Sequence, residues 1–371
     1  MIWLAMAVLV AGAFLAGLVS GHRKTFPFGL LQRLARRLAR RASPPAGDDE
    51  AAGFVIDLAD AQALQARREA LAGFVFGPAG WSSIRPPEDA TGGPPGSLER
   101  RFRDLASHRR WVVRMDHGID SYLDLLLPNG PRRRTTVVYQ QGHEGDPIHG
   151  AHVLQRLLKA GYPVLALAMP LLGDNSQPVV QLRRHGPVRL CDHDFLALVD
   201  HEFGRPSIRF FVEPVLAGIN RLAAEGADRF AMLGWSGGGW TTTLCAALDP
   251  RIRASYSVAG SLPFSQRRRG EMSDYENHLP ALYELANYPE LYVLSASGPS
   301  RSAMQILNEY DTVAWSGRRG LAYERRVQDT LGRLGSGRFS CVIDDTWTGH
   351  GISRAALDRI LSDLETRCEN E

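Results

Sequence analysis

The chain has 371 residues, of which 44% are hydrophobic and 22% are charged, a composition that is ordinary for a globular protein. This length allows one large core with appended segments. The formal net charge of +3 gives no support for a nucleic-acid-binding function. Four widely separated cysteines lack the spacing of metal ligands or of a disulfide framework, so the sequence predicts neither. They are Cys191, Cys245, Cys341 and Cys368.

The amino-terminal segment is apolar. Residues 2–20 carry no charge, and a membrane-spanning helix takes roughly 20 apolar residues. Positive charges follow this run, beginning at Arg23 and Lys24, and the positive-inside rule then places the main body of the chain in the cytoplasm. The sequence therefore predicts a single-pass membrane protein anchored by residues 1–21. A cleaved signal peptide, with a periplasmic or secreted body, is the alternative.

Three further regions follow the apolar run. Residues 22–52 combine a basic amphipathic helix, which is suited to an anionic membrane surface, with a polar linker. Residues 53–110 are predicted to be an extension, with a helix over 57–71 and a loop rich in Gly and Pro over 77–96. Residues 111–371 are predicted to be the main domain.

Strand-like and helix-like segments alternate in the main domain, beginning with a predicted hairpin of strands over 111–115 and 122–127. This alternation predicts an α/β protein with a mostly parallel central sheet and helices on both faces. The later strands are expected over 135–139, 163–167, 229–233, 254–258, 304–307 and 339–343. The helices are expected over 151–159, 210–224, 241–248, 321–334 and 352–366.

The segment Gly234-Trp235-Ser236-Gly237-Gly238 has the pattern G-x-S-x-G. It lies between a predicted strand and a predicted helix, which is the context of a nucleophile elbow, where a strained serine stands at the carboxyl end of a strand. The pentapeptide alone is a weak signal in a chain with 37 glycines. The alternative is an ordinary glycine-rich turn.

A nucleophilic serine needs an adjacent base, and the base needs an acid to orient it. In open parallel sheets such groups lie in loops at the carboxyl ends of the strands. Asp311 follows the predicted strand over 304–307, and His350 follows the predicted strand over 339–343. Ser236, Asp311 and His350 are therefore the candidate nucleophile, acid and base. The rival acids are Glu309, Asp344 and Asp345.

The same chemistry needs N–H donors for the oxyanion. The backbone N–H of Gly237, directly after the candidate nucleophile, is the first candidate. The second is expected in the loop over 140–145, after the predicted strand over 135–139. Because Gly142 allows the backbone to turn, the N–H of His143 is the best candidate in that loop.

Together these motifs resemble the α/β-hydrolase superfamily over about residues 111–367. The resemblance rests on the elbow, on Gly142-His143, on Asn308-x-x-Asp311 and on Thr348-Gly349-His350, with nucleophile, acid and base in the chain order of that superfamily. The chain is most similar to dienelactone-hydrolase, acetylxylan-esterase and prolyl-oligopeptidase-like domains. The resemblance implies an α/β-hydrolase fold and a serine hydrolase of an ester, thioester or amide, with no metal or organic cofactor.

Two alternative functions use the same fold: a non-catalytic, membrane-tethered binding protein, and an acyltransferase whose acceptor is not water. The expected partners are a small-molecule or polymeric ester substrate and a membrane, with no nucleic acid. Residues 171–206 and 261–289 are long insertions between predicted elements. Either is a candidate lid that shapes specificity.

Overall fold

The computed structural model describes residues 54–90, 101–268, 271 and 274–369. The predicted anchor over 1–21 and the basic segment over 22–52 lie outside these residues. No helix in the described part of the chain is both long and apolar enough to cross a membrane.

The main body is built on one large sheet, and its strands follow the predicted order. They are β1 (Glu88–Asp89), β2 (Leu105–Val113), β3 (Ser121–Pro128), β4 (Thr135–Gln140), β5 (Val164–Leu167), β8 (Arg229–Trp235), β9 (Ile252–Val258), β10 (Ser302–Asn308) and β11 (Arg338–Asp344). Their order across the sheet is β1-β2-β3-β5-β4-β8-β9-β10-β11. The first four strands in this order pair antiparallel, and all pairs from β5 to β11 are parallel. The prediction of a mostly parallel sheet is confirmed. A separate hairpin pairs β6 (Val179–Leu182) with β7 (Gly186–Arg189).

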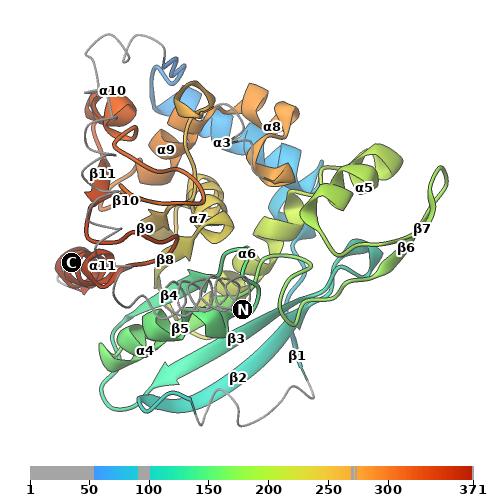
Figure 1. The fold of residues 1–371 in the computed structure, drawn as a ribbon, viewed down its shortest axis with the longest axis horizontal. Coiled ribbons are helices and arrows are strands. Elements are labelled where there is room, and N and C mark those ends of the chain that lie inside the picture. Colours follow the sequence, from blue (N-terminus) through green and yellow to red (C-terminus); the bar gives the residue numbers. More distant parts are fainter. Residues whose placement is uncertain (1–53, 91–100, 269–270, 272–273, 370–371) are drawn as a thin grey trace, which may run out of the picture. The chain divides into compact units, whose positions relative to one another are not determined.

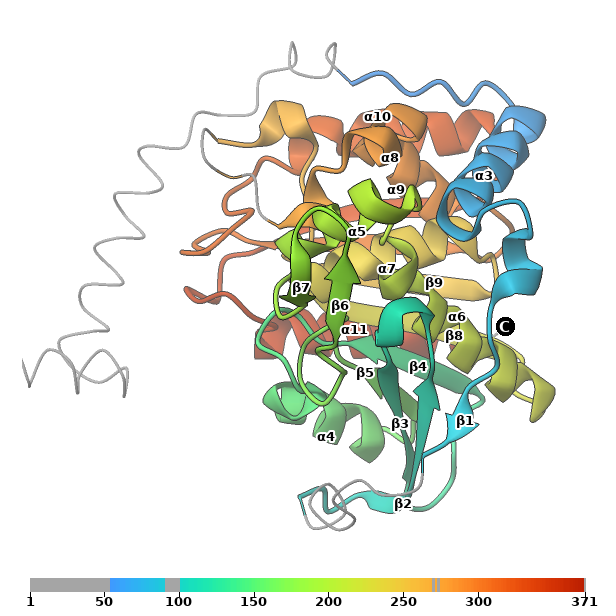
Figure 2. The ribbon, with the colours of Figure 1, turned by 90° about the vertical axis from the view of Figure 1, so that its right-hand side faces the viewer.

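Helices cover both faces of this sheet (Figures 1 and 2). They are α3 (Ala61–Phe76), α4 (Ala151–Lys159), α5 (Leu196–Phe203), α6 (Arg209–Ala224), α7 (Gly237–Leu248), α8 (Pro280–Leu285), α9 (Tyr288–Ala296), α10 (Leu321–Arg333) and α11 (Arg354–Leu364). In Figure 1, α3, α7 and α9 lie on one side of the sheet and α4 and α11 lie on the other. Arg156 and Asp358 join α4 to α11 by a hydrogen bond.

The centre of the sheet explains where a site can form. Strands β4 and β8 are buried along their whole length, as expected for parallel strands covered on both faces. Strand β5, which follows β4 in the chain, pairs with one edge of β4, and the later strand β8 pairs with its other edge. Such a reversal opens a crevice at the carboxyl ends of the two strands.

Several element boundaries differ from the predicted ones by a few residues. The predicted helix over 57–71 begins at Ala61, because the Asp60 side chain caps it by accepting the N–H of Ala63 at 2.8 Å. Because an N-cap residue has a non-helical backbone, the helix itself starts after Asp60. Strand β2 begins at Leu105, so the predicted domain boundary at residue 111 falls within a strand, and the sheet includes part of the predicted extension.

Two buried arginines fasten the helices of one face to each other. Arg68 on α3 donates to the carbonyl oxygens of Ala247 at 2.9 Å and Leu294 at 3.1 Å. Arg301 donates to Ala246 O at 2.6 Å and also to Leu294 O at 3.0 Å. These carbonyls belong to the last turns of α7 and α9, which lack intrahelical donors and carry partial negative charge. Burial lowers the pKa of Arg301, and the neighbouring charge of Arg68 lowers it further.

Replacing Arg68 by methionine keeps the apolar stem but removes both donors. The buried carbonyls of α7 and α9 then lose hydrogen bonds, and we expect Arg68→Met to lower the free energy of unfolding by about 2–3 kcal/mol. Equilibrium unfolding in urea measures this change. Arg325→Met is the matched control, because the Arg325 side chain on α10 is 86% exposed. Equal stability of the two variants would contradict the role given to Arg68.

Candidate functional site

Ser236 stands at the sharp turn between β8 and α7. Its backbone has φ 56° and ψ −128°, a region that residues with side chains rarely adopt. The Ser236 N–H donates to Val258 O at 2.9 Å, which ties the turn to the end of the neighbouring strand β9. The strained serine of the predicted elbow therefore lies at the crevice beside the end of β4.

The glycines around Ser236 allow the backbone to pack closely. A Cβ atom on Gly234 would overlap the carbonyl oxygen of Gly238. A Cβ atom on Gly238 would overlap Gln140 O and lie 2.6 Å from Gln141 O. The first turn of α7 therefore runs directly against the ends of β8 and β4, an approach that only glycine permits.

The three residues predicted as nucleophile, acid and base are brought together. His350 Nε2 lies 2.8 Å from Ser236 Oγ, and His350 Nδ1 lies 2.8 Å from Asp311 Oδ2. An ionised carboxylate only accepts hydrogen bonds, so Asp311 selects the tautomer with the proton on Nδ1. The lone pair of Nε2 then faces the serine hydroxyl.

The rival acids are directed elsewhere. Glu309 pairs with Arg318 at 3.2 Å. Asp344 accepts hydrogen bonds from the N–H of Thr346 at 2.9 Å and from its hydroxyl at 2.6 Å. Asp345 is exposed. Asp311 is buried, and its Oδ2 contacts His350 Nδ1.

Asn308 joins the acid turn to the histidine loop, a role that the sequence analysis missed. Its side-chain amide donates to Gly351 O at 2.9 Å, and to Gly349 O and Asp311 Oδ2 at 3.3 Å each. The same group therefore touches the loop on both sides of His350. The sequence analysis identified Asn308-x-x-Asp311 only as a turn. The carbonyl oxygens that the Asn308 side chain binds belong to the loop after a different strand, β11.

The loop after β4 passes beside the elbow, as predicted for the oxyanion donors. A Cβ atom on Gly142 would lie 2.7 Å from Trp235 O and 2.8 Å from the Cβ atom of Ser236. A Cβ atom on Gly237 would lie 2.5 Å from Cε1 of His143. Gly237 is the first residue of α7, so its N–H has no acceptor within the helix. His143 and Gly237 thus lie next to each other at the elbow.

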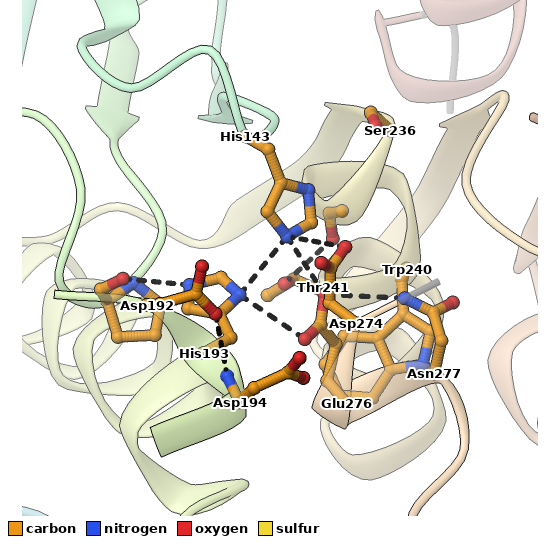
Figure 3. Close-up of polar contacts among 12 residues, drawn as sticks. His143, Asp192, His193, Asp194, Ser236, Trp240, Thr241, Asp274, Glu276 and Asn277 are labelled. Atoms are coloured by element: carbon orange, nitrogen blue, oxygen red, sulfur yellow. Dashed lines mark hydrogen bonds and ion pairs between the residues drawn. The ribbon is translucent and has the colours of Figure 1, made fainter. Parts of the chain in front are cut away.

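The side chain of His143 belongs to a second polar cluster, which the sequence analysis did not find (Figure 3). Its Nε2 lies 3.1 Å from His193 Nδ1, 3.1 Å from Asp274 Oδ2 and 3.3 Å from Glu276 Oε1. His193 comes from the insertion over 171–206, and the two acids come from the insertion over 261–289. Both candidate lids therefore reach the loop after β4, although no local pattern in the sequence connects these residues.

The cluster is electrostatically coupled. Burial alone would lower the pKa of His143, but the hydrogen bond and the charge of Glu276 outweigh it, so the pKa lies above its ordinary value. Burial would raise the pKa of Glu276, and its contacts with His143 and His193 instead depress this pKa well below the usual range. His143, His193 and Glu276 also have the donor atoms of a metal site.

A pocket of about 310 Å³ adjoins the base. His350, Trp235 and Trp347 contribute to its wall, together with Tyr139 from β4. The rings of Trp235 and His350 lie 5.2 Å apart between centroids. The exposed lining is mostly apolar and also includes Glu144, His149, His152 and Arg354, whereas Ser236 is not among the lining residues.

No protein-family model and no curated protein matches this sequence, but solved structures match its fold. The acetyl xylan esterase from Paenibacillus sp. R4 has a TM-score of 0.54 at 13% identity, over 88% of this chain and 100% of its own. Acetyl Xylan Esterase 1 from Thermoanaerobacterium sp. JW/SL YS485 has a TM-score of 0.51 at 14% identity, over 86% of this chain and 97% of its own. The chain has the α/β-hydrolase fold.

Within this α/β-hydrolase fold, Ser236 and His143 lie at the carboxyl ends of the two central strands. Asp311 and His350 follow β10 and β11. Each group is thus held by the end of a different strand of one sheet, which keeps the distances between them fixed.

The close packing of α7 can be tested with a matched pair of helix glycines. Gly238→Ala places a Cβ atom against the backbone of β4, and we expect it to lower the free energy of unfolding by about 1–3 kcal/mol. Gly332→Ala in α10 adds a Cβ atom that meets nothing within 4 Å, so it should raise stability by about 0.5–1 kcal/mol. Chemical denaturation compares the two variants. Equal effects would refute the close approach at Gly238.

Proposed function

We propose that the protein is a serine hydrolase that cleaves a carboxylic ester. The hydrogen-bonded chain from Ser236 Oγ through His350 to Asp311, with both contacts at 2.8 Å, carries this proposal. In the proposed reaction, Ser236 Oγ attacks the carbonyl carbon while His350 Nε2 takes its proton. The carboxylate of Asp311 holds the ring in place and stabilises the imidazolium that forms.

The negative charge on the carbonyl oxygen then needs donors. We assign this role to the N–H groups of Gly237 and His143, because both lie at the elbow and backbone donors cost no reorganisation during the reaction. His350 next returns its proton to the departing alcohol, leaving an acyl group on Ser236. Attack by water, with the same base, releases the acid and restores the serine.

Two observations favour an ester with a small group next to the carbonyl. The pocket beside His350 has a volume of about 310 Å³, at the lower end for ligand sites. The proteins with a similar fold include two named as acetyl xylan esterases. In this proposal the acyl part occupies the pocket beside His350, and either a small molecule or a polymer provides the alcohol part.

Replacement of the nucleophile tests this proposal. Ser236→Ala should lower the hydrolysis of short activated esters by about 10⁴-fold or more, with an unchanged thermal unfolding midpoint. A fluorophosphonate probe should label the wild-type protein and not this variant. Ser82→Ala, at an exposed serine, is the control and should keep both labelling and turnover.

The outcomes separate the alternative functions. Absence of labelling in the wild-type protein would indicate a binding protein on the same fold. Labelling with ester product formed only when an alcohol is added would indicate acyl transfer. Unchanged turnover in Ser236→Ala would refute the assigned nucleophile.

We further propose that the uncharged run over residues 2–20 anchors the protein in a membrane, with the hydrolase in the cytoplasm. The arginines that follow the run support this orientation. A reporter fused to the carboxyl terminus should be active in the cytoplasm, and the protein should stay with the membrane fraction in alkaline carbonate. Activity of a periplasmic reporter would overturn the orientation.

A further inference from the structure

The side chain of His143 meets His193, Asp274 and Glu276 beside the loop after β4. We propose that His143, His193 and Glu276, with Asp274 as a fourth ligand, bind a divalent metal ion of the zinc class. Two imidazoles and carboxylate oxygens are common ligands of such ions. The donor atoms of the first three residues all lie within 4.8 Å of one another.

The tautomer of His193 is set by the backbone. Its Nε2 lies 2.9 Å from Pro170 O, and a carbonyl oxygen only accepts, so Nε2 carries the proton. The lone pair of Nδ1 then points at the cluster. A histidine that binds a metal through one nitrogen usually donates from the other to a backbone carbonyl or a carboxylate, and His193 has this arrangement.

One buried oxygen of Glu276 has no hydrogen-bond partner among the described residues. With His193 in this tautomer, the Nε2–H of His143 faces three acceptors, which belong to His193, Asp274 and Glu276. The second oxygen of Glu276 is buried, has no hydrogen-bond partner in the described structure, and lies 3.3 Å from His193 Nδ1. With a neutral His193, two lone pairs face each other there, which is costly in a buried site. Either a second proton on His193 or a bound cation removes this cost.

The charges also favour a cation. Glu276 is fully buried, and among the described residues its ion pairs are with His143 and His193 and with no lysine or arginine. Asp274 adds a second carboxylate at the edge of the cluster, where 41% of its side chain is exposed. A divalent ion would neutralise both carboxylates, and the exposed edge gives it a path of entry.

The distances fit tetrahedral coordination. Bonds of about 2.0–2.1 Å at tetrahedral angles place neighbouring ligand atoms about 3.3 Å apart. Nε2 of His143 lies 3.1 Å from the donor atoms of His193 and Asp274 and 3.3 Å from Glu276. Figure 3 shows the side chains grouped around His143, and the donor atoms of His143, His193 and Glu276 lie within 4.8 Å of one another, so binding requires them to move closer together.

The position of the ion indicates its role. It would join the insertions over 171–206 and 261–289 to the loop after β4, from which His143 extends. Because the His143 ring lies against Gly237, fixing the ring also fixes the loop that carries the proposed oxyanion donor. The ion therefore positions the oxyanion loop, in addition to the function proposed for Ser236.

Metal binding by the full-length protein tests the inference directly. After treatment with a chelator and its removal, Co²⁺ is titrated into the protein and its visible absorption is followed. We expect one equivalent with the intense bands of tetrahedral cobalt, displaced by one equivalent of Zn²⁺. Zn²⁺ should also raise the thermal unfolding midpoint of the wild-type protein.

Variants locate the ion. Glu276→Gln should weaken Co²⁺ binding by roughly 100-fold or more, and Asp274→Asn, at the exposed edge, by about 10-fold. His185→Ala removes an exposed histidine of the β6–β7 hairpin and should bind as the wild type does. If Glu276→Gln does not fold, Asp274→Asn and its thermal response to Zn²⁺ decide the question.

Two results would overturn the inference: no cobalt bound at micromolar concentration, or equal binding by wild type, Glu276→Gln and Asp274→Asn. Either result would assign the cluster to hydrogen bonding by protonated histidines. Fluorophosphonate labelling of Ser236, measured on the same samples, is independent of this readout. Loss of the metal site would therefore leave the proposed hydrolase function standing, and loss of labelling would leave the metal site standing.

Discussion

The site depends on one steric constraint, the direct contact of the first turn of α7 with the ends of β8 and β4. Gly234 and Gly238 make this contact possible, since a Cβ atom at either would overlap a carbonyl oxygen. The short approach forces the chain through a positive φ at Ser236. The strain is offset by the fully buried helix and strands around it, so the position of the serine is set by the core.

The sequence predicts the features that depend on local patterns and on topology. The alternation of elements is local, and the carboxyl ends of parallel strands meet at one edge, so Ser236, Asp311 and His350 could be placed together before their distances were known. Asn308 and His193 were missed for a shared reason. Each acts on a group that follows a different strand or insertion, and the path of those loops follows from packing over the whole chain.

The fold accommodates buried charge in two different ways. Arg68 and Arg301 lie against the carbonyl ends of α7 and α9, where helix dipoles and unpaired oxygens accept a cation. Glu276 lies in a site where histidines are its ion-pair partners. Asp249 adds a nearby negative charge for Arg68 and Arg301, whereas Glu276 depends on its two histidine partners for compensation. This contrast supports the cation that is proposed for the histidine cluster.

His143 connects the histidine cluster to the proposed reaction. Its ring belongs to the cluster, and its backbone N–H is a proposed oxyanion donor. The backbone is confined by Gly142, which lies against Trp235 and Ser236, and the ring is confined by Gly237 on one side and the acids on the other. With both ends held, the peptide N–H between them has little freedom to turn. An oxyanion donor acts best when it is oriented before the charge develops. The insertions over 171–206 and 261–289, which contribute His193, Asp274 and Glu276, therefore also restrict the peptide N–H that is proposed as an oxyanion donor.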